Sequence, residues 1–284
     1  MREKDKQGEH TRAINSIDNP GYMLYLSIHF EYFGTQNTQY TIIKYKMSES
    51  LFIIGATGLV GSHFLNIAAG STSVSKIVTL SRRTPKLSSN ITNKDVLKPI
   101  IESKTDLWPE IIKTTLDIPD KSTIFSGFGT TRKAAGSAEN FVKIDHDINV
   151  NAFKAAKESG KFDTAIIVSA SGASKDSVFL YMSTKGKIED ELKALKFKRT
   201  IILRPGILLG KRDKAKDWKN TLSASIGGFF KGTFAQSLVG YPIYAEEVAK
   251  AAWYLNQQPI KKEGEVIVIG SKEMIDLVKT ISEK

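Results

Sequence analysis

The sequence contains no cysteine and only four histidines, which lie scattered between residues 10 and 146. Without cysteine the chain can form no disulfide bond, no thiolate metal site and no cysteine nucleophile. The histidines lack the spacing of metal ligands, so we expect no metal site. No apolar run approaches the roughly 20 residues that a membrane-spanning helix requires. What remains is the composition of an ordinary globular protein, with 41% apolar and 25% charged residues.

The chain is basic, with 41 lysines and arginines against 30 acidic residues and a formal net charge of +11. A positive net charge favours an anionic partner, such as a phosphorylated cofactor, a nucleic acid or an acidic membrane surface. The lysines are dispersed rather than grouped in blocks, as on a solvated basic surface. We therefore expect a small-molecule substrate and no nucleic acid, and we keep peripheral membrane contact and a protein partner open.

Residues 1–46 differ in pattern from the rest of the chain and are expected to form an N-terminal extension. Leu24, Leu26, Ile28 and Phe30 alternate with other residues, and this period of two predicts a strand if the segment is ordered. Acidic residues among the basic ones are not typical of an import signal. We expect the extension to be either disordered or a strand, and the remainder of the chain to fold without it.

From residue 47 to residue 284, short apolar runs alternate with helical patterns. The apolar runs cover residues 51–54, 76–80, 123–125, 164–169, 200–203 and 265–269. Strands that alternate with helices predict an α/β protein with a doubly wound parallel sheet, the Rossmann fold. Residues 211–284 are expected to close this sheet and to form a small C-terminal cap on the substrate side.

A glycine-rich turn follows the first apolar run and opens a helical pattern. Its glycines permit a sharp exit from the strand, a close approach of the backbone to a pyrophosphate, and tight packing of the helix on the strand. The unpaired N–H groups at the helix N-terminus would face the anion. The spacing is GxxGxxG rather than the standard GxGxxG, but strand, turn and helix follow in the order that a dinucleotide site requires. The predicted cofactor-binding residues here are Gly55, Thr57, Gly58, Leu59, Val60 and Gly61.

The second strand selects the cofactor. Rossmann folds that bind NAD place an acidic residue about 20 residues beyond the glycines, where it holds the ribose 2′-hydroxyl. This chain instead has Ser81, Arg82 and Arg83 directly after the apolar run. Guanidinium groups pair with a 2′-phosphate that a carboxylate would repel. We therefore predict NADP(H) as the cofactor, with these three residues contributing to its site.

A tyrosine and a lysine form the candidate catalytic pair. Tyr181 and Lys185 stand four residues apart in a helical pattern, so they share one face of the helix. An unperturbed tyrosine, with a pKa near 10, exchanges protons poorly at neutral pH, and a nearby ammonium group favours its phenolate. Ser169 and Ser171 end the preceding strand, and a serine hydroxyl there would orient a substrate carbonyl. We therefore predict Tyr181 as the proton donor, with Lys185 and Ser169 as its catalytic partners.

Taken together, these motifs resemble those of the short-chain dehydrogenase/reductases, in their atypical, extended-like branch. The closer resemblance is to the Tat-interacting-protein oxidoreductases and to their fungal relatives at the mitochondrial outer membrane. Besides the glycine turn and the Tyr-x-x-x-Lys pair, it rests on Gly129-Thr-Thr-Arg132, Phe141-Val-Lys-Ile-Asp145-His-Asp147, Phe179-Leu-Tyr181 and Leu203-Arg-Pro-Gly-Ile-Leu-Leu209. It covers essentially residues 50–284.

The resemblance implies further roles for individual residues. Lys185 would contact the nicotinamide ribose, and Pro205 would belong to a loop against the nicotinamide carboxamide. Gly129 and Thr130 would lie beside the adenosine or the ribose, although a merely structural turn fits them as well. The resemblance also suggests a location at the mitochondrial outer membrane, held peripherally on the cytosolic face, and otherwise the cytoplasm.

Three functions fit these residues. The leading prediction is an NADPH-dependent oxidoreductase of the short-chain type that acts on an unknown carbonyl substrate. The second is a non-catalytic NADPH-binding scaffold or regulatory protein at the mitochondrial outer membrane, because Ala170 stands where related reductases often have a second serine. This difference also makes Ser171 a substitute candidate for Ser169. The third, an NAD-dependent epimerase of nucleotide sugars, is disfavoured by the arginines after the second strand.

Overall fold

The computed structural model describes residues 49–115, 117–210 and 241–283, together with the backbone of three strands between residues 9 and 46. The chain divides into two compact units, residues 1–48 with 257–259 and residues 49–256 with 260–284. The larger unit holds every predicted site residue, so its fold decides where the functional groups lie.

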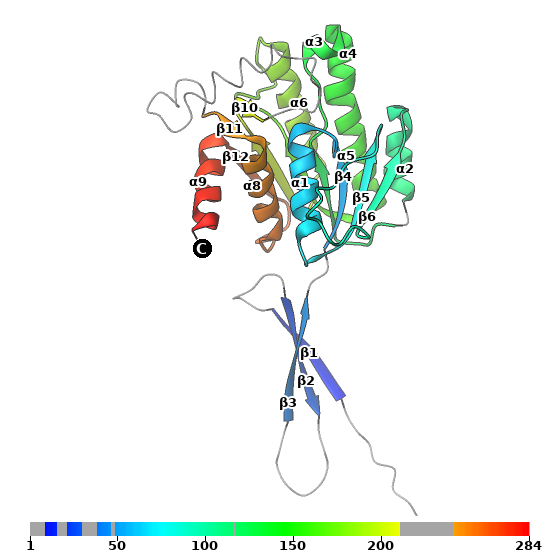
Figure 1. The fold of residues 1–284 in the computed structure, drawn as a ribbon, viewed down its shortest axis with the longest axis vertical. Coiled ribbons are helices and arrows are strands. Elements are labelled where there is room, and N and C mark those ends of the chain that lie inside the picture. Colours follow the sequence, from blue (N-terminus) through cyan, green and yellow to red (C-terminus); the bar gives the residue numbers. More distant parts are fainter. Residues whose placement is uncertain are drawn as a thin grey trace, which may run out of the picture. The chain divides into compact units, whose positions relative to one another are not determined.

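The smaller unit contains a three-stranded antiparallel sheet, drawn in blue in Figure 1. Its strands are β1 (Glu9–Asn15), β2 (Tyr22–His29) and β3 (Gln39–Lys46), in the spatial order β1-β2-β3. Tyr22 pairs with Lys46 and His29 with Gln39, so β2 and β3 are paired over their full lengths. β2 confirms the strand that the alternation from Leu24 onward predicted. That the rest of the chain folds without this extension stays a prediction.

The larger unit is built on a seven-stranded sheet whose described pairings are all parallel. The strands are β4 (Glu49–Ile54), β5 (Val74–Ser81), β6 (Leu97–Ile101), β7 (Ser122–Ser126), β8 (Phe162–Val168), β9 (Arg199–Arg204) and β12 (Glu265–Gly270). Their spatial order is β12-β9-β8-β7-β4-β5-β6, so the chain winds outward from β4 in one direction and from β7 in the other. This arrangement confirms the predicted doubly wound α/β sheet, with its switch point between β4 and β7.

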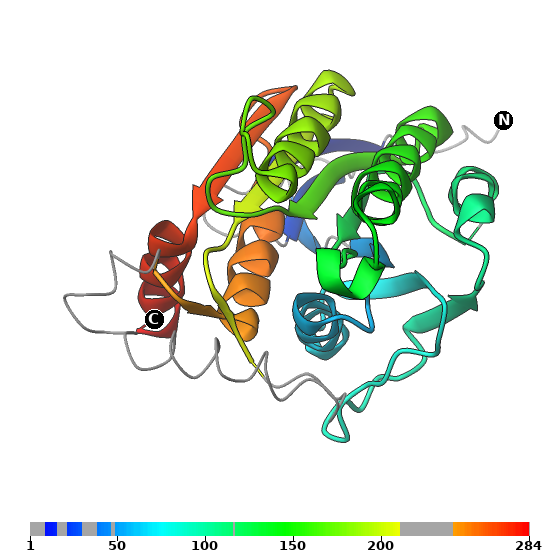
Figure 2. The same ribbon diagram turned by 90° about the horizontal axis from the view of Figure 1, so that it is seen from above.

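Helices cover both faces of this sheet, as Figure 2 shows. The longer ones are α1 (Leu59–Gly70), α2 (Trp108–Thr114), α5 (Ile148–Ser159), α6 (Leu180–Ala194), α8 (Ala245–Gln257) and α9 (Ser271–Ser282). One hydrophobic cluster joins α1, α8 and α9 to one face of the sheet, and a second cluster joins α2, α5 and α6 to the other face. The helical patterns that the sequence contains at α1 and α6 are confirmed.

Burial on two sides explains why the strands consist of continuous apolar runs. In β4, Leu51 and Ile53 belong to the hydrophobic cluster on one face, whereas Phe52 and Ile54 belong to the cluster on the other. All four side chains are fully buried, because a parallel sheet has helices on both sides. Burial of one such side chain contributes about 1.5–3 kcal/mol, so β4 anchors the middle of the fold.

Of the two edge strands of the sheet, the sequence predicted one and missed the other. β12 pairs with β9 at one edge, as expected for the segment that closes the sheet. β6, at the other edge, was not expected, because Lys98 and Pro99 interrupt its apolar pattern. Both side chains are exposed, and an edge strand tolerates a proline that a central strand would not.

The predicted C-terminal cap is described only in part. β10 (Leu208–Leu209) and β11 (Ile243–Tyr244) form a small parallel pair that is separate from the main sheet. The middle of the predicted cap, residues 211–240, lies outside the described residues. The described parts of the C-terminal region therefore extend the sheet and add two helices to one of its faces.

Candidate functional site

The predicted site residues converge at the carboxyl ends of the strands. The glycine turn follows β4, the arginines follow β5, the Gly129–Thr130 turn follows β7, Ser169 follows β8 and Pro205 follows β9. Because these strands are parallel neighbours, the loops that follow them lie along one edge of the sheet. In doubly wound folds this edge binds ligands, next to the switch point.

The glycines of the first loop are required by its close backbone packing. Gly55 has a φ of +82°, and a Cβ there would lie 2.4 Å from the amide nitrogen of Phe128. A Cβ on Gly61 would lie 2.2 Å from the carbonyl oxygen of Gly55. The N–H of Gly58 donates to that same carbonyl at 2.8 Å. The turn is therefore folded tightly against the start of α1, in agreement with the role that the glycine spacing predicted.

The N-terminus of α1 is suited to an anion. The helix begins at Leu59, and its capping residue, Gly58, makes no side-chain hydrogen bond to the first turn. The N–H groups of a first helical turn have no partner within the helix, and no acidic residue lies in this turn. Val60 is buried and Thr57 is exposed. Leu59, Val60 and Gly61 would therefore serve a phosphate through their backbone N–H groups.

The loop after β5 carries two exposed arginines. The guanidinium carbon of Arg82 lies 5.8 Å from the ring centre of Phe128, in the loop after β7, and this is within the range of a cation–π contact. Ser81 is buried, and its hydroxyl donates to the carbonyl oxygen of Arg83 at 2.6 Å. Ser81 thus shapes the turn, and the two arginines supply the positive charge at this corner of the site.

Two buried polar residues hold the loop after β7, and the sequence had given neither of them a role. Asp145 accepts the N–H of Thr130 at 2.9 Å, and a Cβ on Gly129 would lie 2.7 Å from the same carboxylate oxygen. Asn149 donates to the carbonyl oxygen of Phe128 at 3.1 Å. The Gly129–Thr130 turn is therefore fixed by side chains from the helical segment that follows it. The quoted resemblance included Asp145, but its partners are visible only in the fold.

The predicted catalytic pair lies on one face of α6. The Nζ atom of Lys185 is 6.0 Å from the ring centre of Tyr181. Tyr181 is 41% exposed, whereas Lys185 is 4% exposed, so the tyrosine lies at the surface while the lysine is buried. The ring of Phe141 packs at 5.8 Å from that of Tyr181, and Asp145 Oδ2 lies 2.7 Å from Lys185 Nζ. The fold thus brings together Tyr181, Lys185 and the turn after β7.

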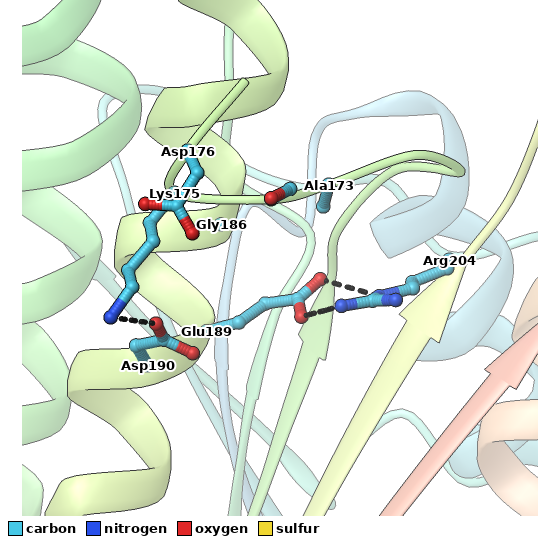
Figure 3. Close-up of a pocket in the computed structure, with 8 residues that line it drawn as sticks. Ala173, Lys175, Asp176, Gly186, Glu189, Asp190 and Arg204 are labelled. Carbon is cyan, nitrogen blue, oxygen red and sulfur yellow. Dashed lines mark hydrogen bonds and ion pairs between the residues drawn. The ribbon is translucent and has the colours of Figure 1, made fainter.

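Ser169 makes a contact that the sequence did not predict. Its buried hydroxyl donates to Glu189 Oε1 at 2.5 Å, two helical turns beyond Tyr181 on α6. Arg204 donates to the same carboxylate, with its Nε atom 3.0 Å from Oε1, and these hydrogen bonds raise the pKa of Arg204. Figure 3 shows the side chain of Glu189 reaching from α6 to Arg204. Ser171, the substitute candidate, is exposed.

The turn of residues 173–176 packs directly on α6. A Cβ on Gly186 would lie 2.2 Å from the amide nitrogen of Lys175, so backbone meets backbone at this point. Beside the contact is a hollow of about 190 Å³, whose lining includes Glu189, Asp190 and Arg204 (Figure 3). Neither Tyr181 nor Lys185 lines it. The hollow is therefore a feature of the flank of α6, apart from the Tyr181–Lys185 pair.

The loop after β9 returns to the glycine turn. Pro205 is buried, and the N–H of the next residue, Gly206, donates to Ser271 Oγ at 2.7 Å. Gly210 has a φ of +150°, and a Cβ there would lie 2.9 Å from a methyl carbon of Leu59. The segment that begins at Pro205 therefore ends against the first residue of α1, which links the predicted nicotinamide side of the site to its phosphate side.

Within the described residues, no group of three or more histidine, aspartate or glutamate side chains is arranged to hold a metal ion. No helix in the same ranges has the length and apolar character needed to cross a membrane.

A model of the HIM1 family matches residues 73–234. A mitochondrial protein of Candida albicans named FMP52 is 44% identical, over 82% of this chain and 100% of its own length. The FMP52 protein of Debaryomyces hansenii is 42% identical, over 82% of this chain and 99% of its own length. Both relatives are thus matched over nearly their whole length.

Solved structures share the fold at low sequence identity. A short chain dehydrogenase family protein from Francisella tularensis superposes with a TM-score of 0.53 at 12% identity, over 79% of this chain and 98% of that one. A UDP-glucuronic acid 4-epimerase from Bacillus cereus in complex with NAD superposes with a TM-score of 0.55 at 16% identity, over 83% of each chain. At these identities the likeness establishes the Rossmann architecture alone.

Proposed function

Because the chain belongs to the HIM1 family and has the FMP52 mitochondrial proteins as relatives, we propose that it is an NADPH-dependent oxidoreductase of the short-chain dehydrogenase/reductase type, acting on a carbonyl substrate. The observation that carries the proposal is the Tyr181–Lys185 pair on α6, at the sheet edge where the glycine turn also lies. A proton donor and a dinucleotide cradle at one edge are what carbonyl reduction requires. Kinship with the Tat-interacting-protein oxidoreductases, which the motifs suggest, is part of the same proposal.

The residues that would hold the cofactor fit its chemistry. The glycine turn is folded against the N-terminus of α1, where no side chain caps the helix, so a pyrophosphate there would meet the unpaired N–H groups of the first helical turn. Arg82 and Arg83 would pair with the 2′-phosphate of NADP(H), since guanidinium groups bind phosphate oxygens through charge-assisted hydrogen bonds. When bound, the dihydronicotinamide would supply the hydride for the carbonyl carbon.

The protein's own part in the reaction would be a proton transfer. The phenol of Tyr181, 41% exposed, donates its proton to the carbonyl oxygen, which becomes the hydroxyl of the product alcohol. The ammonium of Lys185, 6.0 Å from the ring centre of Tyr181, would stabilise the phenolate that remains, because a nearby opposite charge favours the ionised form. Phe141 holds the ring of Tyr181 from one side, which limits the positions that the phenol can adopt.

Two measurements test this function. Calorimetric titration with NADPH and with NADH is expected to give tighter binding of NADPH, and a preference for NADH would contradict the cofactor assignment. Screening aldehydes and ketones for NADPH oxidation should find a substrate, and Tyr181→Phe should then lower kcat by about 10²-fold or more while NADPH binding stays unchanged. Full turnover by the Tyr181→Phe protein would exclude the phenol as proton donor.

A second function, a non-catalytic NADPH-binding scaffold or regulatory protein, is favoured by one observation. The hydroxyl of Ser169 is engaged by Glu189, and Ala170 follows it, so the serine expected to orient a carbonyl is otherwise occupied. In this alternative a partner protein would bind only the cofactor-loaded form, and pull-down with and without NADPH separates the two functions. For either function we propose a mitochondrial location, held peripherally on the cytosolic face of the outer membrane, which follows the names of the relatives and the resemblance in sequence.

A further inference from the structure

A π-helical turn interrupts the helical segment that leads into α5. The segment consists of α4 (Ala138–Val142), the π-helical turn η2 (Lys143–Asp147) and α5. π-helical turns are rare, and they occur frequently at functional sites because they redirect side chains at some cost in stability. The residue in the middle of this one is Asp145, which is 1% exposed. The turn therefore serves to bring a carboxylate into the interior.

The carboxylate of Asp145 has two neighbours from different parts of the site. Its Oδ2 atom lies 2.7 Å from Nζ of Lys185 on α6. Its Oδ1 atom accepts the N–H of Thr130 at 2.9 Å, and the absence of a side chain on Gly129 makes room for it. The two oxygens thus connect the lysine of the catalytic pair to the turn after β7.

The other charged groups near this point are engaged elsewhere. On η2, His146 lies 2.8 Å from Asp147 and 2.8 Å from Glu191. On α6, Glu189 receives Ser169 and Arg204. Among the described residues, Asp145 is therefore the carboxylate within ion-pair distance of Lys185. A buried ammonium without a counter-ion is costly, and this contact provides Lys185 with a counter-ion.

We propose that Asp145 is a positioning residue, the counter-ion that keeps Lys185 charged and fixed beside Tyr181 and that ties this lysine to the Gly129–Thr130 turn. Its catalytic consequence rests on the proposed function, whereas the counter-ion role itself requires no turnover. Asp145 touches neither the substrate nor the reacting phenol in this scheme; it acts through Lys185.

The first experiment measures the proton affinity of Lys185 directly in the full-length, cofactor-free protein. Trace labelling with acetic anhydride across a pH series, followed by peptide mass spectrometry, gives the pH at which labelling of Lys185 is half-maximal. In Asp145→Asn this midpoint should fall by about one pH unit or more, because a buried lysine that loses an adjacent carboxylate releases its proton more readily. The amide can still accept the N–H of Thr130. An unchanged midpoint in the folded variant would overturn the proposal.

Asp147→Asn is the matched control, because it removes a carboxylate from the same π-helical turn without touching Lys185. Asp147 is 53% exposed in its side chain and contacts His146. Its removal should leave the midpoint of Lys185 within about 0.3 pH units, since exposed charges are screened by solvent. A shift as large as that of Asp145→Asn would show that net charge, rather than the specific pair, controls the lysine, and would also overturn the proposal.

A stability cycle covers the case in which Asp145→Asn folds poorly. Each of Asp145→Asn and Lys185→Met leaves one buried charge without its partner, so both should lower the melting temperature. The double variant Asp145→Asn/Lys185→Met removes both charges and should be at least as stable as the less stable single variant. Losses that simply add in the double variant would contradict the pairing.

Turnover gives an independent readout once a carbonyl substrate is found. In Asp145→Asn the high-pH limit of carbonyl reduction should move to lower pH, in parallel with the labelling midpoint, and kcat should fall by about tenfold or more. An equal fall in kcat at every pH would indicate a merely structural role and count against the proposal. If the wild-type protein reduces no carbonyl, the proposed function fails while the labelling experiment still decides the role of Asp145.

Discussion

Two carboxylate–cation contacts are made by residues four positions apart on α6, and they differ in the hydrogen-bonding capacity that remains on the α6 side chain. At Lys185 the helix provides the cation, which is buried and meets Asp145 through one ion pair. At Glu189 the helix provides the anion, whose two oxygens receive the guanidinium of Arg204 and the hydroxyl of Ser169. An ammonium has three donors, so Lys185 keeps capacity for the hydroxyl groups of a cofactor, whereas the acceptors of Glu189 are occupied.

Under the proposed function, the difference separates the reacting groups from the structural contacts along a single helix. Glu189 joins α6 to the ends of β8 and β9, because Ser169 follows β8 and Arg204 ends β9. Lys185 instead faces the turn after β7 and the ring of Tyr181. We therefore expect changes at Glu189 to act on folding stability alone, and changes around Lys185 to act on chemistry as well as on stability.

The largest expected effect that would break this division is at Glu189. Glu189→Gln leaves Arg204 without its counter-charge, and the loss should be about 2–3 kcal/mol, below the 3–5 kcal/mol of a fully buried pair because Arg204 is partly exposed. For a chain of this size that corresponds to a fall in Tm of roughly 5–10 °C. Thermal melts check the stability, and the pH profile of carbonyl reduction by the folded variant should match that of the wild type. A displaced profile would place Glu189 with the reacting groups.

An intermediate effect is expected at Ser169. Ser169→Ala removes one hydrogen bond to a carboxylate that still receives Arg204, at a cost of about 1.5 kcal/mol. If the serine belongs to the Glu189 contact, kcat should change by less than about threefold, well short of the loss expected for a general acid–base group. Ser171→Ala, at an exposed position, is the control. Loss of turnover in Ser169→Ala without loss of stability would return this serine to the catalytic group.

The smallest effect concerns Glu191, a third carboxylate on α6 that is partly exposed. Burial alone would raise the pKa of Glu191, but Lys154 and His146 outweigh it, so the pKa lies below its ordinary value. A lowered pKa means that the contact contributes stability above the unfolded-state value, near 4.3, and loses it as pH falls through the folded-state value. Glu191→Gln should therefore cost about 0.2–1 kcal/mol at neutral pH, and the difference should disappear at an acid pH below the folded-state value. Urea unfolding at both pH values measures it, and a cost that persists in acid would show that packing rather than charge is responsible.

Much of the fold could be predicted because its central strands are buried on both faces. The apolar runs that became β4, β5, β7, β8, β9 and β12 are continuous, and each lies next to a helical pattern or a turn. The glycine turn was predictable as well, since steric contacts such as that between Gly61 and Gly55 admit no side chain. β6 was not predicted, because an edge strand needs no continuous apolar run and does not use every backbone N–H in hydrogen bonds to a neighbouring strand.

The partners of the site residues could not be predicted. Asp145 and Lys185 are separated in sequence by α5 and β8, and no local pattern links a carboxylate on one helix to an ammonium on another. The same holds for Ser169 and Glu189. Spacing along one helix identified Tyr181 with Lys185 because both lie on the same element, whereas contacts between elements depend on how the helices pack on the sheet.

The contact at Gly186 has a mechanical consequence for Tyr181, the proposed proton donor. No side chain separates α6 from the backbone of Lys175. Because backbone packs directly on backbone here, a shift of the helix along its axis would bring main-chain atoms into collision. The position of Tyr181 relative to the sheet therefore depends on Gly186, the smallest residue of α6. The methyl group added by Gly186→Ala would collide with this backbone, and α6 would have to tilt or shift together with Tyr181.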